Sequence, residues 1–396
     1  MASPDQLRCL DRWAGGAACS LLALTGARRQ PRLFRGDTPC DVLVMQLAEM
    51  GSMVLALPAL EELRARVPGV RLHFLVIKES RALIDALQLA PDERVYPLDF
   101  SGPAAALRSL WTSLRACRRA KLAAALHFDF FARGHAAFAA AACPDGERAG
   151  FDNGCHDARR ALLTRPVLYS PHHHTAEMFA ALARSLFLDP KDAPFARIPP
   201  IKLAALPAYR AEKKTIDALR EKLGASADQP LLLVNANASE RLTLRRWPVE
   251  RFAEATHQWL DAHADWHAVL VGSPSDRIAN TEVATHPRII DLTGQTSFAE
   301  LLALMSMARL LLCNDSGPAH FASLAALRSV VLFGPETPAL YAPLGGRAEC
   351  LYANFACSPC VSAYNDKSSS CPRSVCLEHI GTDAVLAAME RAMARS

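Results

Sequence analysis

Apolar and polar positions alternate along the chain in two similar series. Short, almost continuous apolar runs are separated by longer stretches in which apolar residues recur every three or four positions. The runs predict strands buried on both faces, and the stretches between them predict amphipathic helices. Strands are predicted in the first series at 41–47, 71–77, 94–100 and 122–130, with a helix over 59–67. In the second series they are predicted at 231–237, 267–273, 288–294, 309–315 and 329–335.

Five prolines interrupt the alternation between residues 189 and 208. Proline removes a backbone donor and restricts the residue before it, so this stretch predicts a linker. The predicted fold class is α/β, with two doubly wound, Rossmann-like domains. Ligands bind beyond the carboxyl ends of the strands in such sheets, and we expect the two sets of ends to face each other across a cleft. The predicted parts are an arm (1–37), an N-terminal domain (38–190), the linker (191–210), a C-terminal domain (211–380) and a terminal helix (381–396).

The tetrapeptide Ser297-Phe-Ala-Glu300 predicts a capping box at the start of a helix. Phe298, Leu301, Leu302 and Met305 follow at helical spacing, which predicts that they pack in the core.

Charge adds one feature to this picture. The net charge is only +4, which gives no support for a nucleic-acid partner, but residues 1–40 carry six arginines against three aspartates. Within this arm, the uncharged run 13–27 is too short to cross a bilayer and lacks the form of a signal peptide. One interpretation is an amphipathic helix packed on the domain. The other is a helix resting on an anionic membrane surface, which would make the protein peripheral on the inner face of the membrane.

The chain has twelve cysteines and no secretory signal, a combination typical of a reducing compartment, so we expect a cytoplasmic protein. Four cysteines cluster near the C-terminus, in the segment 357–376. The spacing within each of the two pairs is plausible for zinc ligands, but two disulfides or a set of reduced thiols would fit as well. These alternatives stay open, and we assign no metal to the active site. The four are Cys357, Cys360, Cys371 and Cys376.

The strongest chemical signal is "LLLCNDSGPAHFASLAA" at 310–326, where a strand ends in a polar turn before a helix. Gly317 and Pro318 fit the cap and first position of that helix, whose free N–H groups and dipole attract phosphate. Ser316 and His320 can add hydrogen bonds, and Asp315 can hold an amide or a sugar hydroxyl. The alternative is an elaborate helix cap with a satisfied histidine.

A second signal follows the strand predicted at 231–237. Asn237 begins a polar loop that leads to Arg245-Arg246-Trp247-Pro248. Arginine forks suit a diphosphate. The alternative is a solvated basic turn in which Trp247 packs as an anchor.

Together these segments resemble glycosyltransferase family 9, the heptosyltransferases and relatives that build the lipopolysaccharide inner core. The resemblance runs from about Asp41 to about Ile380. It rests on "QLAEMGSMVLALPALEELRARVPG", "RRWPVERFAE", "LTGQTSFAELLALM" and "NDSGPAHFASLAA…SVVLFGPETPALYAPLG". It implies a GT-B fold and an inverting, metal-independent transfer from a nucleotide-sugar donor of the ADP-heptose type. The implied acceptor is a lipopolysaccharide core at the cytoplasmic membrane face, and no other cofactor is implied.

The resemblance also implies roles for individual residues of the C-terminal domain. The donor diphosphate would bind at Asp315, Ser316, Gly317 and His320. Arg245 stands where the family has lysine, and it would offset the charge of the leaving group, so Arg245 and Asp315 are assigned to catalysis. The rest of the donor site would be Asn237, Asp276 near the ribose and Thr296 in the base pocket.

One motif departs from the family. Its members carry Gly-Asp-x-x-x-x-x-Pro, with the aspartate proposed as the general base, whereas this chain has Gly51-Ser52 and Pro58. Our hypothesis is that Glu49 replaces the aspartate from the loop 48–52, while Ser52 orients the acceptor. The alternative is that Glu49 is a solvated loop residue, with Asp129 as the base or no base at all.

Asp129 and Arg133 end a strand in the N-terminal domain, where they could bind an anionic acceptor or form a local ion pair. Two other functions compete with the transferase. One is a relative that binds the nucleotide sugar but has lost catalysis, and the other is a sugar-nucleotide epimerase. The three histidines at 172–174 predict a polar loop before a helix, not a metal site. No early G-x-G-x-x-G occurs, which disfavours a nicotinamide enzyme.

Overall fold

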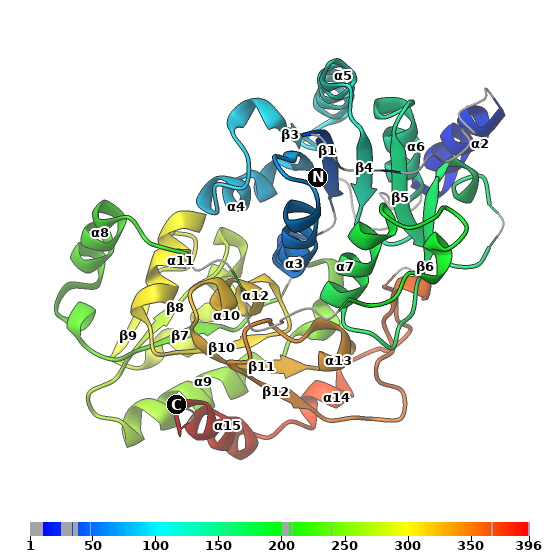
Figure 1. Cartoon of the computed structure of the whole chain (residues 1–396). Helices are drawn as coiled ribbons and strands as arrows, with labels where there is room; N and C mark the ends of the chain where they lie inside the picture. The colour runs from blue at the N-terminus through cyan, green and yellow to red at the C-terminus, as the bar shows by residue number, and fades with distance from the viewer. Residues whose placement is uncertain are drawn as a thin grey trace. The chain divides into compact units, whose positions relative to one another are not determined.

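The computed structural model describes residues 11–24, 34, 39–47, 49–155, 157–199, 206, 209–238, 240–365 and 367–394. The chain divides into two compact units, unit 1 (1–202) and unit 2 (203–396). Each unit holds one six-stranded parallel sheet with helices packed on it (Figure 1). The predicted doubly wound α/β class is therefore confirmed. That the two sheets face each other across a cleft stays a prediction.

The sheet of unit 1 has the strand order β3-β2-β1-β4-β5-β6. The four predicted strands are present, and β5 and β6 are additional. The sequence pattern missed these two because they carry charged residues: Glu147 of β5 and Arg165 of β6 are both buried and pair at 2.8 Å. The strands are β1 (Asp41–Gln46), β2 (Arg71–Ile77), β3 (Val95–Leu98), β4 (Ala124–His127), β5 (Glu147–Asp152) and β6 (Arg165–Leu168).

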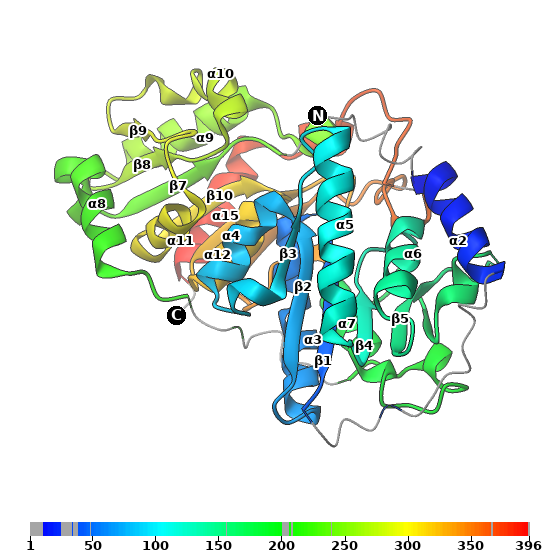
Figure 2. The ribbon, with the colours of Figure 1, turned by 90° about the horizontal axis from the view of Figure 1, so that it is seen from above.

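Helices cover both faces of this sheet. Helices α3 (Met50–Arg66) and α7 (Thr175–Ser185) pack together on one face. On the other, α6 (Arg133–Ala142) lies between α5 (Pro103–Ala120) and the arm helix α2 (Gly16–Leu24), as Figure 2 shows. The predicted helix at 59–67 is the second half of α3. The short α4 (Arg81–Ala86) connects β2 to β3.

The arm is docked on unit 1. A short π-helical turn (Asp11–Gly15) leads into α2, whose Cys19 and Ala23 pack against Ala136 and Ala140 of α6. This confirms packing of the predicted arm helix on the domain as far as Leu24. The remainder of the predicted run, 25–27, lies outside the described residues, as do the arginines at 28, 29, 32 and 35.

The sheet of unit 2 has the order β12-β11-β10-β7-β8-β9. All five predicted strands are present. The sixth, β12, was missed because it is a half-buried edge strand that mixes Glu349 with apolar residues. The strands are β7 (Leu231–Asn235), β8 (His267–Leu270), β9 (Ile289–Asp291), β10 (Leu310–Asn314), β11 (Arg328–Phe333) and β12 (Ala348–Tyr352).

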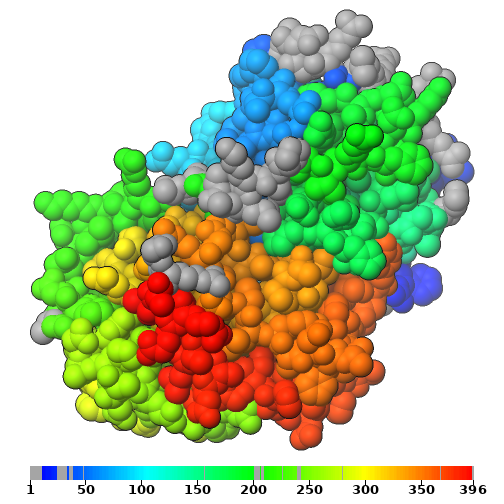
Figure 3. Space-filling view, turned by 60° about the horizontal axis from the view of Figure 1, so that its bottom comes forward, coloured from blue at the N-terminus to red at the C-terminus, as the bar shows by residue number. Residues whose placement is uncertain are grey.

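The predicted capping box of unit 2 is confirmed at the start of α11. Ser297 N–H donates to Glu300 Oε2 over 2.7 Å, and Glu300 N–H donates to Ser297 Oγ over 3.2 Å. The C-terminal helix α15 packs on α9 and on the strands β10, β11 and β12, and Figure 3 shows it in red at the surface of unit 2. The helices are α8 (Lys213–Leu223), α9 (Val249–Ala262), α10 (Arg277–Asn280), α11 (Phe298–Met307), α12 (Gly317–Leu324), α13 (Pro338–Tyr341), α14 (Val375–Glu378) and α15 (Thr382–Ala394).

Each sheet has one point where the direction of strand succession reverses. In unit 1 this switch point lies between β1 and β4, and in unit 2 between β7 and β10. Loops on either side of a switch point diverge to opposite faces of the sheet, which leaves room for a ligand at the carboxyl ends. The predicted linker 191–210 stays a prediction. The boundary between the units falls at Lys202, and residues 200–205, 207 and 208 lie outside the description.

Candidate functional site

The switch point of unit 2 brings Arg245 and Asp315 together. Asp315 directly follows β10, and its backbone N–H donates to the carbonyl of Leu332 on β11 over 3.0 Å. Arg245 ends a short 3-10 segment (Glu240–Arg245) that follows β7. Both side chains are buried, with 3.9 Å between Arg245 Nη1 and Asp315 Oδ2. A guanidinium and a carboxylate from two segments seventy residues apart therefore meet at the ligand-binding edge of the sheet.

Trp247 fixes the segment that carries Arg245. Its backbone N–H donates to Asn314 Oδ1 on β10, and its indole Nε1–H donates to the carbonyl of Ile380, both over 2.9 Å. The neighbouring Arg246 donates twice to the carbonyl of Ala238. Trp247 thus packs as the expected anchor, but Arg245 is buried and the turn is not a solvated one.

The start of α12 provides backbone donors beside this pair. Ser316 is the N-cap residue and Gly317 the first helical residue, one position earlier than predicted. The N–H of Ala319 is not one of the free donors expected at this helix start, because it donates to the carbonyl of Ser316 over 3.1 Å. Within the described chain, the N–H groups of Ser316 and Gly317 have no partner, as is usual in a first helical turn. His320 is buried in the same turn.

The other predicted donor residues follow successive strands. Asn237, after β7, donates to Asn280 Oδ1 over 3.1 Å, and Asn280 donates to Thr293 Oγ1 over 2.7 Å. Asp276, after β8, accepts hydrogen bonds from the N–H and hydroxyl of Ser273, each over 2.8 Å. Thr296 is half-buried after β9. These residues lie along one sheet edge leading away from Arg245, and Asp276 is partly engaged in a local cap.

Sequence reasoning missed one acidic residue at this edge. Glu336 follows β11 in the Gly334-Pro335-Glu336 turn and is 1% exposed. In the sequence, this residue could have been noticed as an isolated carboxylate between apolar segments, directly after a predicted strand.

The switch point of unit 1 is centred on Asp129, which is buried at the end of β4. Asp129 Oδ1 accepts from Gln46 Nε2 over 3.1 Å, and Oδ2 accepts from the backbone N–H of Leu47 over 2.7 Å. His135 Nε2 lies 3.0 Å from Oδ2. Both oxygens are therefore held by protein groups, which weakens the predictions of Asp129 as acceptor ligand or alternative base.

Two histidines lie near this carboxylate, the buried His127 and the partly buried His135. Burial works to lower the pKa of His135, but the charge and hydrogen bond of Asp129 raise it overall above its ordinary value. Burial lowers the pKa of His127 to about 3, and the nearby His135 and Arg159 act in the same direction. His127 is therefore neutral near pH 7.

Glu49 and Ser52 lie at the start of α3. The prediction that Ser52 belongs to a loop is wrong: the helix begins at Met50, and Ser52 N–H donates to the carbonyl of Glu49 over 3.1 Å. Glu49 is the N-cap residue, so Ser52 occupies the third helical position. Side chains at these two positions are neighbours in a helix start, although Glu49 makes no side-chain cap hydrogen bond. Ala48 lies outside the described residues.

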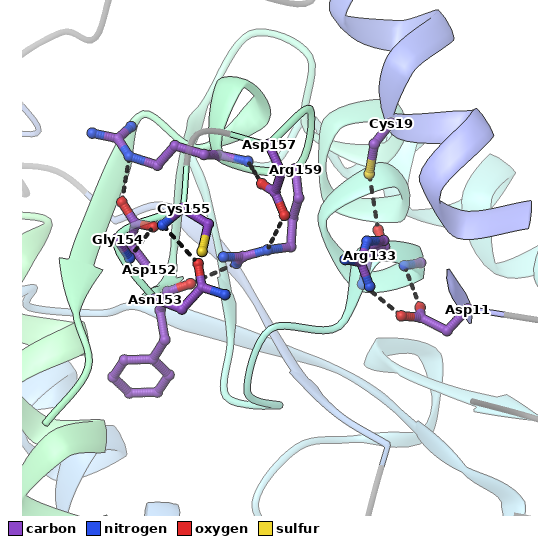
Figure 4. Close-up of polar contacts among 12 residues, drawn as sticks. Asp11, Cys19, Arg133, Asp152, Asn153, Gly154, Cys155, Asp157 and Arg159 are labelled. Carbon is purple, nitrogen blue, oxygen red and sulfur yellow. Dashed lines mark hydrogen bonds and ion pairs between the residues drawn. The ribbon is translucent and has the colours of Figure 1, made fainter. Parts of the chain in front are cut away.

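Arg133 lies beside the arm. Asp11 accepts hydrogen bonds from the backbone N–H groups of Arg133 and Gly134, over 3.0 and 2.7 Å, at the start of α6 (Figure 4). Cys19 Sγ–H donates to the carbonyl of Arg133 over 3.3 Å. The ion pair of Asp129 described above is with His135, and a local Asp129–Arg133 pair stays a prediction.

The remaining motifs have local roles. His174 is the N-cap of α7 and shares a capping box with Glu177, as expected for a loop before a helix. Cys357, Cys360, Cys371 and Cys376 are free thiols, and no group of three or more metal-ligating side chains occurs within the described residues.

In the part of the chain that the structure describes, no helix is both long and apolar enough to cross a membrane.

A doubly wound sheet with a basic residue and an open helix start at its switch point is typical of proteins that bind phosphate-containing ligands. The model of glycosyltransferase family 9 (heptosyltransferase) matches residues 123–369, and the chain belongs to this family. The family resemblance of the sequence motifs is thereby confirmed.

Individual relatives are similar over different lengths. The chain is 28% identical over 113 residues to lipopolysaccharide heptosyltransferase 2 of Escherichia coli (strain K12), a match that covers 27% of this chain and 32% of that protein. It is 22% identical over 317 residues to the lipopolysaccharide core heptosyltransferase OpsX of Haemophilus influenzae, covering 78% and 82%. The structure of E. coli ADP-heptose lps heptosyltransferase II aligns with a TM-score of 0.68 at 19% identity, over 89% of this chain and 98% of that one. This last likeness supports the expected GT-B fold.

Proposed function

We propose that this member of glycosyltransferase family 9 transfers a heptose from an ADP-heptose-type donor to a lipopolysaccharide core acceptor. The observation that carries the proposal is the buried Arg245 beside Asp315 and the open start of α12, at the switch point of unit 2. The names of the similar proteins support the sugar and the acceptor class.

The donor would lie along the carboxyl edge of the unit 2 sheet. Its diphosphate would accept hydrogen bonds from the N–H groups of Ser316 and Gly317 and pair with Arg245. The nucleoside would extend past Asn237 toward Asp276 and Thr296, which follow β8 and β9 in strand order. A guanidinium and a helix dipole offset the charge that develops on the departing diphosphate. This supports a transfer in which no metal ion assists the leaving group.

The acceptor would be activated in unit 1. In an inverting transfer, the acceptor oxygen attacks the anomeric carbon as the nucleoside diphosphate leaves, and the hydroxyl proton passes to a base. Glu49 is our choice, because its N-cap position makes it a neighbour of Ser52, the residue at the family aspartate position. Asp129 is disfavoured as base because both of its oxygens already accept hydrogen bonds. A cytoplasmic location, with the protein peripheral on the inner face of the membrane, is part of the proposal.

The test is acceptor-dependent release of ADP. Purified protein is incubated with ADP-heptose, with or without lipopolysaccharide that lacks core heptose, and with UDP-glucose as the control donor. We expect ADP release and heptosylated lipid only when ADP-heptose and acceptor are both present. Binding of ADP without any turnover would instead indicate a catalytically impaired relative, and sugar interconversion without acceptor would indicate an epimerase.

A further inference from the structure

Exposed apolar side chains gather on one face of unit 1. Helix α5 exposes Leu107 and Trp111, at 71% and 58% of their surface. The arm exposes Trp13, Leu21 and Leu24, at 75%, 63% and 84%. These five are almost half of the eleven large apolar side chains exposed in the described chain. Their helices, α5 and α2, flank α6 in the same layer (Figure 2).

The same face is strongly basic. Helix α5 carries Arg108, Arg115, Arg118 and Arg119 and no acidic residue. Arg118 donates to the carbonyl of Ala141, whereas the other three form no ion pair with any described residue. In helix α3, by contrast, the arginines are neutralised within the helix, because Arg64 pairs with Glu61 and Arg66 with Glu62. The positive charge of α5 is therefore not neutralised locally.

The apolar and basic residues of α5 share one side of the helix. Leu107, Trp111, Arg115 and Arg119 recur every four positions, and the Arg115 guanidinium lies 5.9 Å from the centre of the Trp111 ring. Tryptophan and leucine among arginines are typical of helices that lie in the headgroup region of a bilayer. Protein interfaces are also enriched in tryptophan and arginine. Four arginines on one helix without an acidic residue favour a strongly anionic partner, and the leucine and tryptophan among them favour a bilayer over a nucleic acid.

The arm adds apolar surface but is itself anchored. Its inward side is fixed by Asp11 at the start of α6 and by the packing of Cys19 and Ala23. The outward residues Trp13, Leu21 and Leu24 cannot turn into the unit without breaking these contacts. We propose that the outward surface of α5 and α2, the α5–α2 face, rests on an anionic lipid bilayer. This deepens the proposed function, which uses a lipid-linked acceptor, but lipid binding is measurable without donor or acceptor.

Vesicle sedimentation of the full chain tests the proposal. The probes are vesicles of phosphatidylcholine alone and vesicles with 30% phosphatidylglycerol. We expect at least ten-fold tighter binding to the anionic vesicles. The triple variant Arg108→Gln, Arg115→Gln, Arg119→Gln should lose on the order of a hundred-fold, because each basic residue near an anionic surface contributes roughly five-fold. The matched control replaces the exposed Lys213, Lys214 and Arg220 of α8 with Gln and should bind like the wild type.

A second variant separates apolar from charge contributions. Leu107→Ser with Trp111→Ser should weaken binding several-fold at every salt concentration, whereas the loss in the arginine variant should shrink as salt screens the charges. Retained thermal stabilisation by ADP shows that a variant is folded.

Three results would overturn the proposal: no vesicle binding, equal binding to neutral and anionic vesicles, or a triple variant that binds like the wild type. The proposal would also be overturned if the protein bound duplex DNA as tightly as it binds anionic vesicles at the same salt concentration. Transfer to a detergent-dispersed acceptor tests the proposed function separately, so failure of one is distinguishable from failure of the other.

Discussion

The two switch points place a buried aspartate at the same position of the same fold, yet the surroundings differ. Asp129 of unit 1 accepts from a backbone N–H and a glutamine amide and also pairs with His135. Asp315 of unit 2 lies 3.9 Å from Arg245, farther than a hydrogen bond reaches. A helix start with unpartnered N–H groups adjoins Asp315. The first carboxylate holds two strand ends together, whereas the second belongs to a cationic site for an anionic ligand.

The comparison shows that a buried acid at a carboxyl edge does not by itself identify a ligand site. What distinguishes the two points is the charged neighbour of the acid, which is His135 in unit 1 and Arg245, beside an open helix start, in unit 2. Unit 1 supplies donors from its own chain, so Asp129 contributes to stability. In unit 2 the guanidinium of Arg245 and the open start of α12 lie together beside Asp315, which favours a bound diphosphate.

The largest expected effect concerns the base in unit 1. Glu49→Gln should lower acceptor-dependent turnover by about 10²–10⁴-fold with little loss of donor affinity, because a positioned general base contributes that much. Turnover and ADP affinity are measured in parallel with Ser52→Ala, which we expect to lose less. Near-full turnover in Glu49→Gln would remove Glu49 from the reaction.

The second prediction is that replacing either aspartate lowers the free energy of unfolding of the protein, but by different amounts. Asp129→Asn should lower the free energy of unfolding by about 3 kcal/mol, because its amide group opposes the donors of Leu47 or Gln46 and leaves His135 without a counter-charge. Asp315→Asn is the matched variant, and we expect a smaller loss, because the 3.9 Å between Asp315 and Arg245 is longer than a hydrogen bond. Urea titrations measure both. Equal losses would mean that the two switch points do not differ as argued.

The third prediction tests the cationic site. Arg245→Ala should weaken ADP binding or turnover by roughly ten- to a hundred-fold, because a hydrogen bond to a charged group is worth about 1.5–3 kcal/mol. Arg246→Ala is the control, since that side chain donates to Ala238 and should leave ADP affinity close to wild type. Calorimetric titration with ADP measures both. Unchanged affinity and rate in Arg245→Ala would exclude Arg245 from the site.

The smallest effect is the acid sensitivity of unit 1. Burial holds the pKa of His127 near 3, below its unfolded value of about 6.5. Below pH 6.5 the unfolded chain binds a proton that the folded chain does not, so stability falls as pH falls. Between pH 6.5 and 5 this amounts to about 2 kcal/mol. His135, whose pKa is raised, acts above pH 6.5 and in the opposite sense: its stabilisation is lost as pH rises through its folded pKa.

Denaturation at several pH values measures this slope. His127→Asn should be less stable at every pH because it leaves a cavity, but its stability should vary less between pH 6.5 and 5. A slope identical to that of the wild type would show that His127 does not carry the acid sensitivity.

The sequence determined most of the fold through local patterns. Apolar runs identified nine of the twelve strands, because a strand buried on both faces must be apolar throughout. The capping box at Ser297 was predicted because its two residues are close in the sequence. The turn at 314–317 was predicted because a polar cluster between a strand and a helix is conspicuous in sequence and rarely needed for turning alone.

Only the tertiary structure decided which polar groups are satisfied. The strands β5 and β6 were missed because each contains a buried charged residue, Glu147 or Arg165. These two residues can be buried because they pair with each other, and they lie eighteen positions apart in the sequence. Asp129 and Asp315 look alike as residues after strands, but their partners come from β1, α6 and the segment after β7. Hydrogen bonds and ion pairs depend on distances between segments far apart in the chain, and local periodicity carries no record of those distances.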